Sequence, residues 1–269
     1  MAARLISPTG KPKLLGVVHP NVGLRIAYSG RLDRQIEAMA AAVLRAIAAA
    51  WRRKPPELTG DESPAVHLRN IIRRLRDEWE AKFEAFAGGF GRKAAYEGAA
   101  HTDRAFTAQL RKAGFTVKFR MTDAMNDVVQ ASITENVSLI RSIPAQYFTQ
   151  IESIVSEGVR VGRDMHVIAQ GLEHQLGVTK RRAAIIARDQ TNKSTAAIVR
   201  VRQQEVGATH ARWVHSGGGV HPRPSHVEMD GETYEIVKGS WDKDEQAWVW
   251  PGQLINCRCR SRTIVPGIG

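Results

Sequence analysis

The sequence predicts a mainly α-helical protein with a small α+β module at its C-terminal end. Two observations support this fold class: apolar residues recur every three or four positions over much of residues 31–207, and this pattern stops near Gly207. Short extended runs separated by glycine and proline follow, which favours strands joined by turns. A hydrophobic content of 43% and a charged content of 25% are ordinary for globular proteins and exclude wholesale disorder.

The chain is expected to divide into four consecutive parts. Residues 1–30 carry prolines and glycines without periodicity, so they predict an irregular arm. Residues 31–120 form a basic helical region and residues 121–207 a helical middle. Residues 208–269 form the α+β module.

Two long helices are predicted in the basic region, followed by a shorter one. The first runs from Leu32 to Trp51, with apolar positions on one face. The second is opened by Pro64 and carries an apolar, aromatic stripe as far as Phe90, which we interpret as core. The third, around Phe106 and Leu110, is expected to end near Gly114, and residues 116–120 predict a strand or an extended connection.

Four helices are expected in the middle region. The first begins at Thr122, and the second follows Pro144, because proline interrupts the hydrogen bonds of a helix. A short third helix is expected to stop at Gly177, and a basic fourth helix runs from Thr179 to near Gly207.

The α+β module is predicted from three extended runs and one helical turn. The runs are residues 208–215, 232–237 and 257–265. Between the first two, Pro224 is expected to open a single helical turn that Gly231 closes.

Positive charge is concentrated in the N-terminal half. Residues 1–120 hold 22 Lys and Arg against 11 Asp and Glu, whereas residues 121–269 hold 17 against 16. Such an imbalance indicates a polyanionic neighbour, for which double-stranded DNA is the natural candidate, or else a solvated basic helix surface. The residues expected to contact DNA are Arg69, Arg73, Arg74 and Arg76.

The chain is expected to be soluble, not to be exported from the cell, and to keep its cysteines reduced. No apolar run approaches the roughly 18 residues of a membrane-spanning helix, and residues 1–13 lack the apolar core and cleavage site of a signal peptide. The two cysteines, Cys257 and Cys259, are separated by one residue, which does not suit a secreted disulfide scaffold. A reducing cytoplasm is therefore expected.

Five short motifs follow one another in the C-terminal half. They are residues 138–144; Arg188-Asp189-Gln190; Trp213 before a glycine turn; Arg223-Pro224-Ser225-His226 with Asp230-Gly231; and Asn256-Cys257-Arg258-Cys259. In this order, over about residues 138–265, they resemble the Mu F-like family of phage head-morphogenesis proteins. The first 120 residues carry no comparable motif.

The resemblance implies a structural protein of a phage particle rather than an enzyme. It implies a minor capsid component that associates with portal and capsid proteins during head assembly, and with DNA during packaging or delivery. The expected location is the virion, in the capsid interior or near the portal, after assembly in the host cytoplasm. No membrane partner is expected.

Read from the residues alone, the C-terminal motifs also permit a metal site. The candidate ligands are the imidazoles and thiols of His215, His221, His226, Cys257 and Cys259, which lie within 45 residues of one another. Imidazole nitrogen and thiolate sulfur are the donors of tetrahedral zinc, although this spacing is not a standard one.

A structural role for the same residues is the main alternative. An arginine, Arg188 or Arg223, is then expected to bond a carboxylate such as that of Asp189 or Asp230. His226 would cap a helix or bond backbone groups.

A third interpretation is a nucleophile, in which His226 or His221 deprotonates Cys257 or Cys259. No orienting third residue or oxyanion element can be assigned from the sequence, so no catalytic residue is assigned. Two rival functions therefore remain beside head assembly: a DNA-binding accessory protein, and a zinc- or thiol-dependent enzyme.

Overall fold

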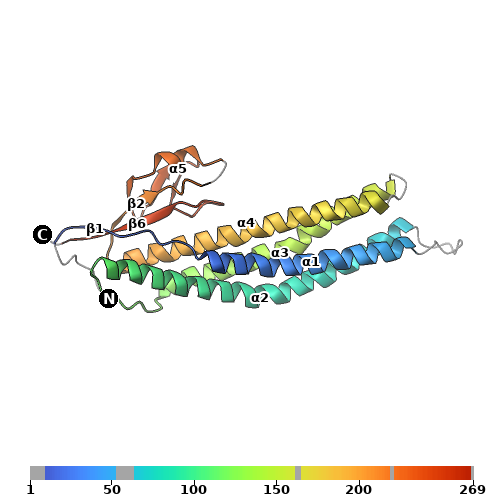
Figure 1. Ribbon diagram of the computed structural model, residues 1–269, viewed down its shortest axis with the longest axis horizontal. Helices are drawn as coiled ribbons and strands as arrows, with labels where there is room; N and C mark the ends of the chain where they lie inside the picture. The colour runs from blue at the N-terminus through green and yellow to red at the C-terminus, as the bar shows by residue number, and fades with distance from the viewer. Residues whose placement is uncertain (1–9, 53–63, 161–164, 219–220, 268–269) are drawn as a thin grey trace. The chain divides into compact units, whose positions relative to one another are not determined.

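Four long helices precede a small α+β region in the computed structural model, which describes residues 10–52, 64–160, 165–218 and 221–267 (Figure 1). The helices are α1 (Val22–Arg52), α2 (Pro64–Lys112), α3 (Asp123–Arg160) and α4 (Met165–Glu205). The predicted mainly α fold with a small C-terminal α+β module is confirmed. None of the helices described has both the length and the apolar character needed to cross a membrane.

The chain forms two compact units, each built from segments that are distant in sequence. The sheet unit contains residues 1–25, 93–133 and 188–269, and the helical unit contains residues 26–92 and 134–187. All four long helices contribute residues to both units. The units therefore do not follow the four consecutive parts expected from the sequence, because packing between long helices joins residues far apart in the chain.

The helical unit has an apolar core along the faces that the sequence pattern predicts. The residues of α1 with no exposed surface are Leu32, Ile36, Met39, Val43 and Ile47, and the buried stripe of α2 comprises Leu68, Ile72, Trp79, Phe83, Ala87 and Phe90. The aromatic stripe of α2 is thus core, as interpreted. However, α1 begins at Val22, inside the predicted irregular arm.

Three predicted helix breaks are absent from the described structure. Phe106 belongs to α2 rather than to a separate helix, α3 continues through Pro144, and α4 continues through Gly177. Proline inside a helix costs about 3 kcal/mol and glycine about 1 kcal/mol. Residues on both sides of Pro144, including Ile143 and Tyr147, are buried, so tertiary packing offsets this cost.

The sheet unit contains a four-stranded antiparallel sheet and a separate hairpin. The sheet has the order β1-β6-β2-β3, formed by β1 (Lys13–Leu14), β6 (Arg260–Val265), β2 (His210–Val214) and β3 (Thr233–Glu235). The hairpin pairs β4 (Ser240–Asp242) with β5 (Ala247–Val249), and the short helix α5 (Pro224–Glu228) lies between β2 and β3 in sequence.

The three predicted C-terminal strands are present with shorter bounds, as β2, β3 and β6. The strands β1, β4 and β5 were not predicted, because runs of two or three residues are too short for a periodic signal. Residues 116–120 form a connection without a strand.

An apolar core joins the sheet to the ends of α2 and α4. Trp213 and Ala211 of β2 have no exposed surface, and Phe106 and Leu110 of α2 pack in the same cluster. Gly207 adopts a φ of 73° and lets the chain turn from α4 into β2, as its position after the helical pattern predicts.

Candidate functional site

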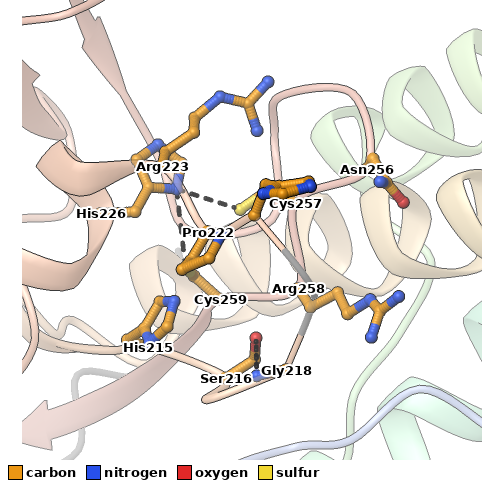
Figure 2. Close-up of a pocket in the computed structure, with 11 residues that line it drawn as sticks. His215, Ser216, Gly218, Pro222, Arg223, His226, Asn256, Cys257, Arg258 and Cys259 are labelled. Carbon is orange, nitrogen blue, oxygen red and sulfur yellow. Dashed lines mark hydrogen bonds between the residues drawn. The ribbon is translucent and has the colours of Figure 1, made fainter.

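Three buried donor side chains meet in the sheet unit. His226 comes from α5, and Cys257 and Cys259 come from the segment that leads into β6. The Nδ1 atom of His226 lies 3.4 Å from the sulfur of Cys257 and 3.6 Å from the sulfur of Cys259, as Figure 2 shows. One donor atom from each residue fits within a group in which all atoms lie within 4.8 Å of one another.

The second ring nitrogen of His226 faces a carboxylate. Its Nε2 lies 3.1 Å from Oδ2 of Asp242, at the end of β4, and the Asp242 side chain has no exposed surface. The other carboxylate oxygen accepts the backbone N–H groups of Asp244 (2.9 Å) and Glu245 (3.3 Å) in the β4–β5 turn. When Nε2–H donates to Asp242, the Nδ1 lone pair of His226 points toward the two sulfurs.

Local structure holds the His226 ring in this position. Pro224 occupies the first turn of α5, where its missing N–H leaves no helical hydrogen bond unmade, and the Ser225 N–H donates to Asp244. The indole of Trp213 packs edge-on against the imidazole, with ring centroids 5.1 Å apart and planes at 76°. The ring is therefore fixed by packing on one side and by hydrogen bonds at both nitrogens.

The cysteine segment is bound to α4 by the second and the last of the five motifs. Asn256 has a φ of 63°, a conformation that asparagine tolerates better than most residues. Its N–H donates to Asp189 (2.5 Å), and its side-chain oxygen accepts a hydrogen bond from Arg188 (2.7 Å). Nearby on α4, Asn192 donates to the carbonyl of Cys257 at 3.3 Å.

Arg223 bonds a carboxylate as expected, but the partner is Glu245 rather than Asp189 or Asp230. The guanidinium of Arg223 contacts Glu245 and the carbonyl of Ile255, all at 3.3 Å. Asp230 accepts the backbone N–H of His215 at 2.8 Å. Arginine–aspartate pairs were predicted because the sequence shows charge but not which backbone groups need partners.

The remaining motif residues have structural positions. Gly231 adopts a φ of 83° after α5, and its N–H donates to the carbonyl of Trp213 at 3.0 Å. Gln190 is buried in α4. His226 does not cap a helix or bond a backbone group as one interpretation proposed, since its two nitrogens face the thiols and Asp242.

Burial and the close contacts shift the pKa values of this cluster. A hydrogen bond from the Cys259 thiol, together with His226, lowers the pKa of Cys257 to about 4, against the opposing effect of burial. The pKa of Cys259 is raised, first by this hydrogen bond and then by burial. Burial lowers the pKa of His226, but its contact with Cys257 and the charge of Asp242 outweigh burial, so the net shift is upward.

Only part of the candidate ligand set comes together. His215 and His221 line the same pocket as His226, Cys257 and Cys259, but they lie outside the compact group of donors. Asp242 was not among the candidates, because it lies in a segment without a motif and its role depends on the hairpin fold. The sequence carries no signal that would have identified it.

Two kinds of chemistry fit the cluster. The line from Asp242 through His226 to Cys257 has the order of groups that activates a thiol nucleophile, with Asp242 as the orienting residue that the sequence left unassigned. Alternatively, one imidazole and two thiols are a partial ligand set for a tetrahedral metal. A thiol nucleophile needs only one cysteine in contact with the imidazole of His226, whereas a metal ion would be bound by both cysteines.

The predicted DNA-contacting arginines lie on α2 in the helical unit. Arg69, Arg73 and Arg74 are exposed. Arg76 is partly buried and forms an ion pair with Glu152 at 2.6 Å, so part of its charge is compensated.

The cluster and its supporting α4 motif lie within a region that known proteins share. Residues 149–262 match the Phage Mu protein F like family. This match confirms the resemblance over the segment from the middle of α3 to β6, which contains four of the five motifs; the first motif, residues 138–144, lies outside it.

Half of this chain also resembles a bacterial protein. The chain is 33% identical over 135 residues to an uncharacterized protein of Haemophilus influenzae. The alignment covers 50% of this chain and 29% of that protein, so the chain spans less than a third of the relative's length. No solved structure matches.

Proposed function

We propose that this protein is a minor head protein that associates with the portal during phage head assembly and resides in the virion. The observation that carries the proposal is the family match over residues 149–262, which includes both the buried cluster and the α4 motif that holds it. The side chains of this cluster are buried and bond one another. This supports a docking module whose surface, rather than its interior, binds the partner.

The hairpin offers the apolar surface that such docking needs. Trp241 of β4 and Trp248 of β5 are 50% and 42% exposed, and their rings lie edge to face with centroids 5.6 Å apart. Lys238 lies over the Trp248 ring, 3.9 Å from its centroid. Tryptophans are enriched among the residues that dominate protein interfaces.

Binding of the full-length chain to purified portal protein from the same phage tests this proposal. The Trp241→Ala, Trp248→Ala double variant is expected to lose at least about 2 kcal/mol of binding, roughly 30-fold in Kd. Ile255→Ala is the control, because Ile255 is a single apolar side chain that is 68% exposed in the same unit. Failure of the unaltered protein to bind, or equal binding by the double variant, contradicts the proposal.

We further propose that the exposed arginines near the start of α2 bind packaged DNA. The excess of Lys and Arg in residues 1–120 and the exposure of Arg69, Arg73 and Arg74 support this part. Each phosphate contact contributes about 0.9 to the slope of log affinity against log salt.

Fluorescence anisotropy with a double-stranded DNA fragment over a range of salt concentrations measures this slope. Changing Arg69, Arg73 and Arg74 to glutamine is expected to reduce it by about 0.9 for each phosphate that the variant no longer neutralises. A variant with Arg92, Arg104 and Arg111 changed to glutamine removes the same charge at other exposed positions of α2. Equal slopes in the two variants would show that only net charge matters and would overturn the assignment of the three arginines.

A further inference from the structure

We propose that His226, Cys257 and Cys259 bind a zinc ion that fixes the C-terminal part of the sheet unit. This inference does not depend on the proposed role at the portal. The donor atoms are Nδ1 of His226 and the two sulfurs.

The spacing of the donors fits a tetrahedral ion. Zinc–sulfur bonds of about 2.3 Å and zinc–nitrogen bonds of about 2.0 to 2.1 Å place a nitrogen and a sulfur about 3.5 Å apart around a tetrahedral centre. The two observed separations from His226, 3.4 Å and 3.6 Å, lie on either side of this value. Both nitrogen–sulfur separations therefore match those around a tetrahedral zinc ion.

Burial of both thiols against one nitrogen also favours a metal. Cys257 is 4% exposed, Cys259 2% and His226 2%, and both sulfurs lie close to the same ring nitrogen. One cation between the three atoms binds all of them at once, and the two protons that the cluster holds leave to solvent.

Asp242 completes the arrangement typical of a metal-binding histidine. In such sites the ring nitrogen that does not bind the metal usually donates its proton to a carboxylate or a carbonyl, which fixes the tautomer. Here Asp242 receives Nε2–H of His226 at 3.1 Å and is itself held by two backbone N–H groups of the hairpin turn.

Metal binding would join three segments that are otherwise connected by loops. Through its ligands and Asp242, the ion connects α5, the hairpin of β4 and β5, and the chain entering β6. The three ligands also line the pocket that includes His215 and His221. A fourth ligand, either a water molecule or one of these two histidines, would bind from the pocket side.

Zinc content of the purified full-length protein, measured by elemental analysis after dialysis, tests the proposal. We expect about one zinc per chain, with loss of the metal in a Cys257→Ser, Cys259→Ser double variant. His174→Ala is the matched control, because His174 is an exposed histidine of α4 outside the cluster. A metal-free protein that also fails to take up added zinc overturns the proposal, as does a double variant that keeps its zinc.

A second measurement applies even where the double variant does not fold. Cobalt added to the metal-free, full-length protein is expected to give thiolate charge-transfer absorption and the intense visible bands of a tetrahedral site. Asp242→Asn keeps all three ligands and is expected to weaken zinc binding about 10- to 100-fold. Octahedral cobalt bands without thiolate charge transfer would contradict binding by these three side chains. Unchanged zinc affinity in Asp242→Asn, with thiols that do not bind the metal, would contradict it as well.

Discussion

The two compact units bury different kinds of side chain. Among the residues that the structure describes, thirteen polar or charged side chains are buried, and the helical unit contributes only Asn136 and Thr179 to this set. The other eleven belong to the sheet unit. Both units have an apolar core, but the sheet unit in addition buries a network of hydrogen bonds and charges that the helical unit largely lacks.

α4 shows this contrast within a single helix. Its first part, in the helical unit, buries Ile168, Leu172 and Ile186, whereas its last part buries Asp189 and Arg202. Apolar contacts tolerate substitution by residues of similar size, but a buried polar group without its partner incurs a desolvation penalty. The sheet unit should therefore be the more sensitive to single substitutions.

The largest effect is expected at Arg202, whose side chain is 1% exposed. It donates two hydrogen bonds to Asp103 (2.7 and 2.8 Å), and others to Glu205 and to the carbonyl of Arg120. Arg202→Ala leaves two partly buried carboxylates without their cation and is expected to cost about 3 to 5 kcal/mol. Urea denaturation followed by circular dichroism measures this loss of unfolding free energy. A loss smaller than that from removing an exposed ion pair would show that the sheet unit does not depend on its buried polar contacts.

A smaller effect is expected at Asp189. Asp189→Ala removes the acceptor of the Asn256 N–H and is expected to cost about 1 to 3 kcal/mol. Because Asn256 precedes the cysteine segment, the variant should also bind zinc more weakly. Lys193→Ala is the control, since Lys193 pairs with the same carboxylate at 3.2 Å from within α4. Equal zinc affinity in the two variants would show that the hydrogen bond from Asn256 to Asp189 does not contribute to metal binding.

The helical unit should respond less to a conservative change in its core. Ile36 of α1 has no exposed surface, and Ile36→Val is expected to cost about 0.5 to 1.5 kcal/mol with no change in zinc content. Denaturation and elemental analysis of the same sample check both parts. Loss of zinc in this variant would mean that zinc binding in the sheet unit depends on the core of the helical unit, which would contradict the contrast between the units.

The smallest effect is expected at an exposed ion pair. Arg141 and Glu84 form an ion pair in the helical unit, with about half of each side chain exposed. Arg141→Ala should change stability by no more than about 1 kcal/mol, because solvent screens the pair and the side chains lose entropy in forming it. This variant is the reference for Arg202→Ala.

Sequence patterns predicted the helices better than the site. Apolar periodicity predicts α1 and the stripe of α2 because each helix buries one face regardless of its partner. The uninterrupted course of α3 through Pro144 could not be predicted, because it depends on packing that offsets a local cost.

The site was predicted in part. The residue types of His226, Cys257 and Cys259 indicate metal chemistry, but nothing in their spacing separates them from His215 and His221. The selection among these five depends on the left-handed conformation at Asn256 and on the carboxylate of Asp242, and both follow from tertiary structure.

Hydrogen exchange of the full-length protein, measured by mass spectrometry with and without a chelator, tests most directly whether a metal-centred polar network holds the sheet unit. We expect faster exchange in residues 223–228, 240–249 and 256–262 after chelation, with unchanged protection in residues 32–47 of α1. No change in the three C-terminal segments, or an equal loss of protection in α1, would contradict it.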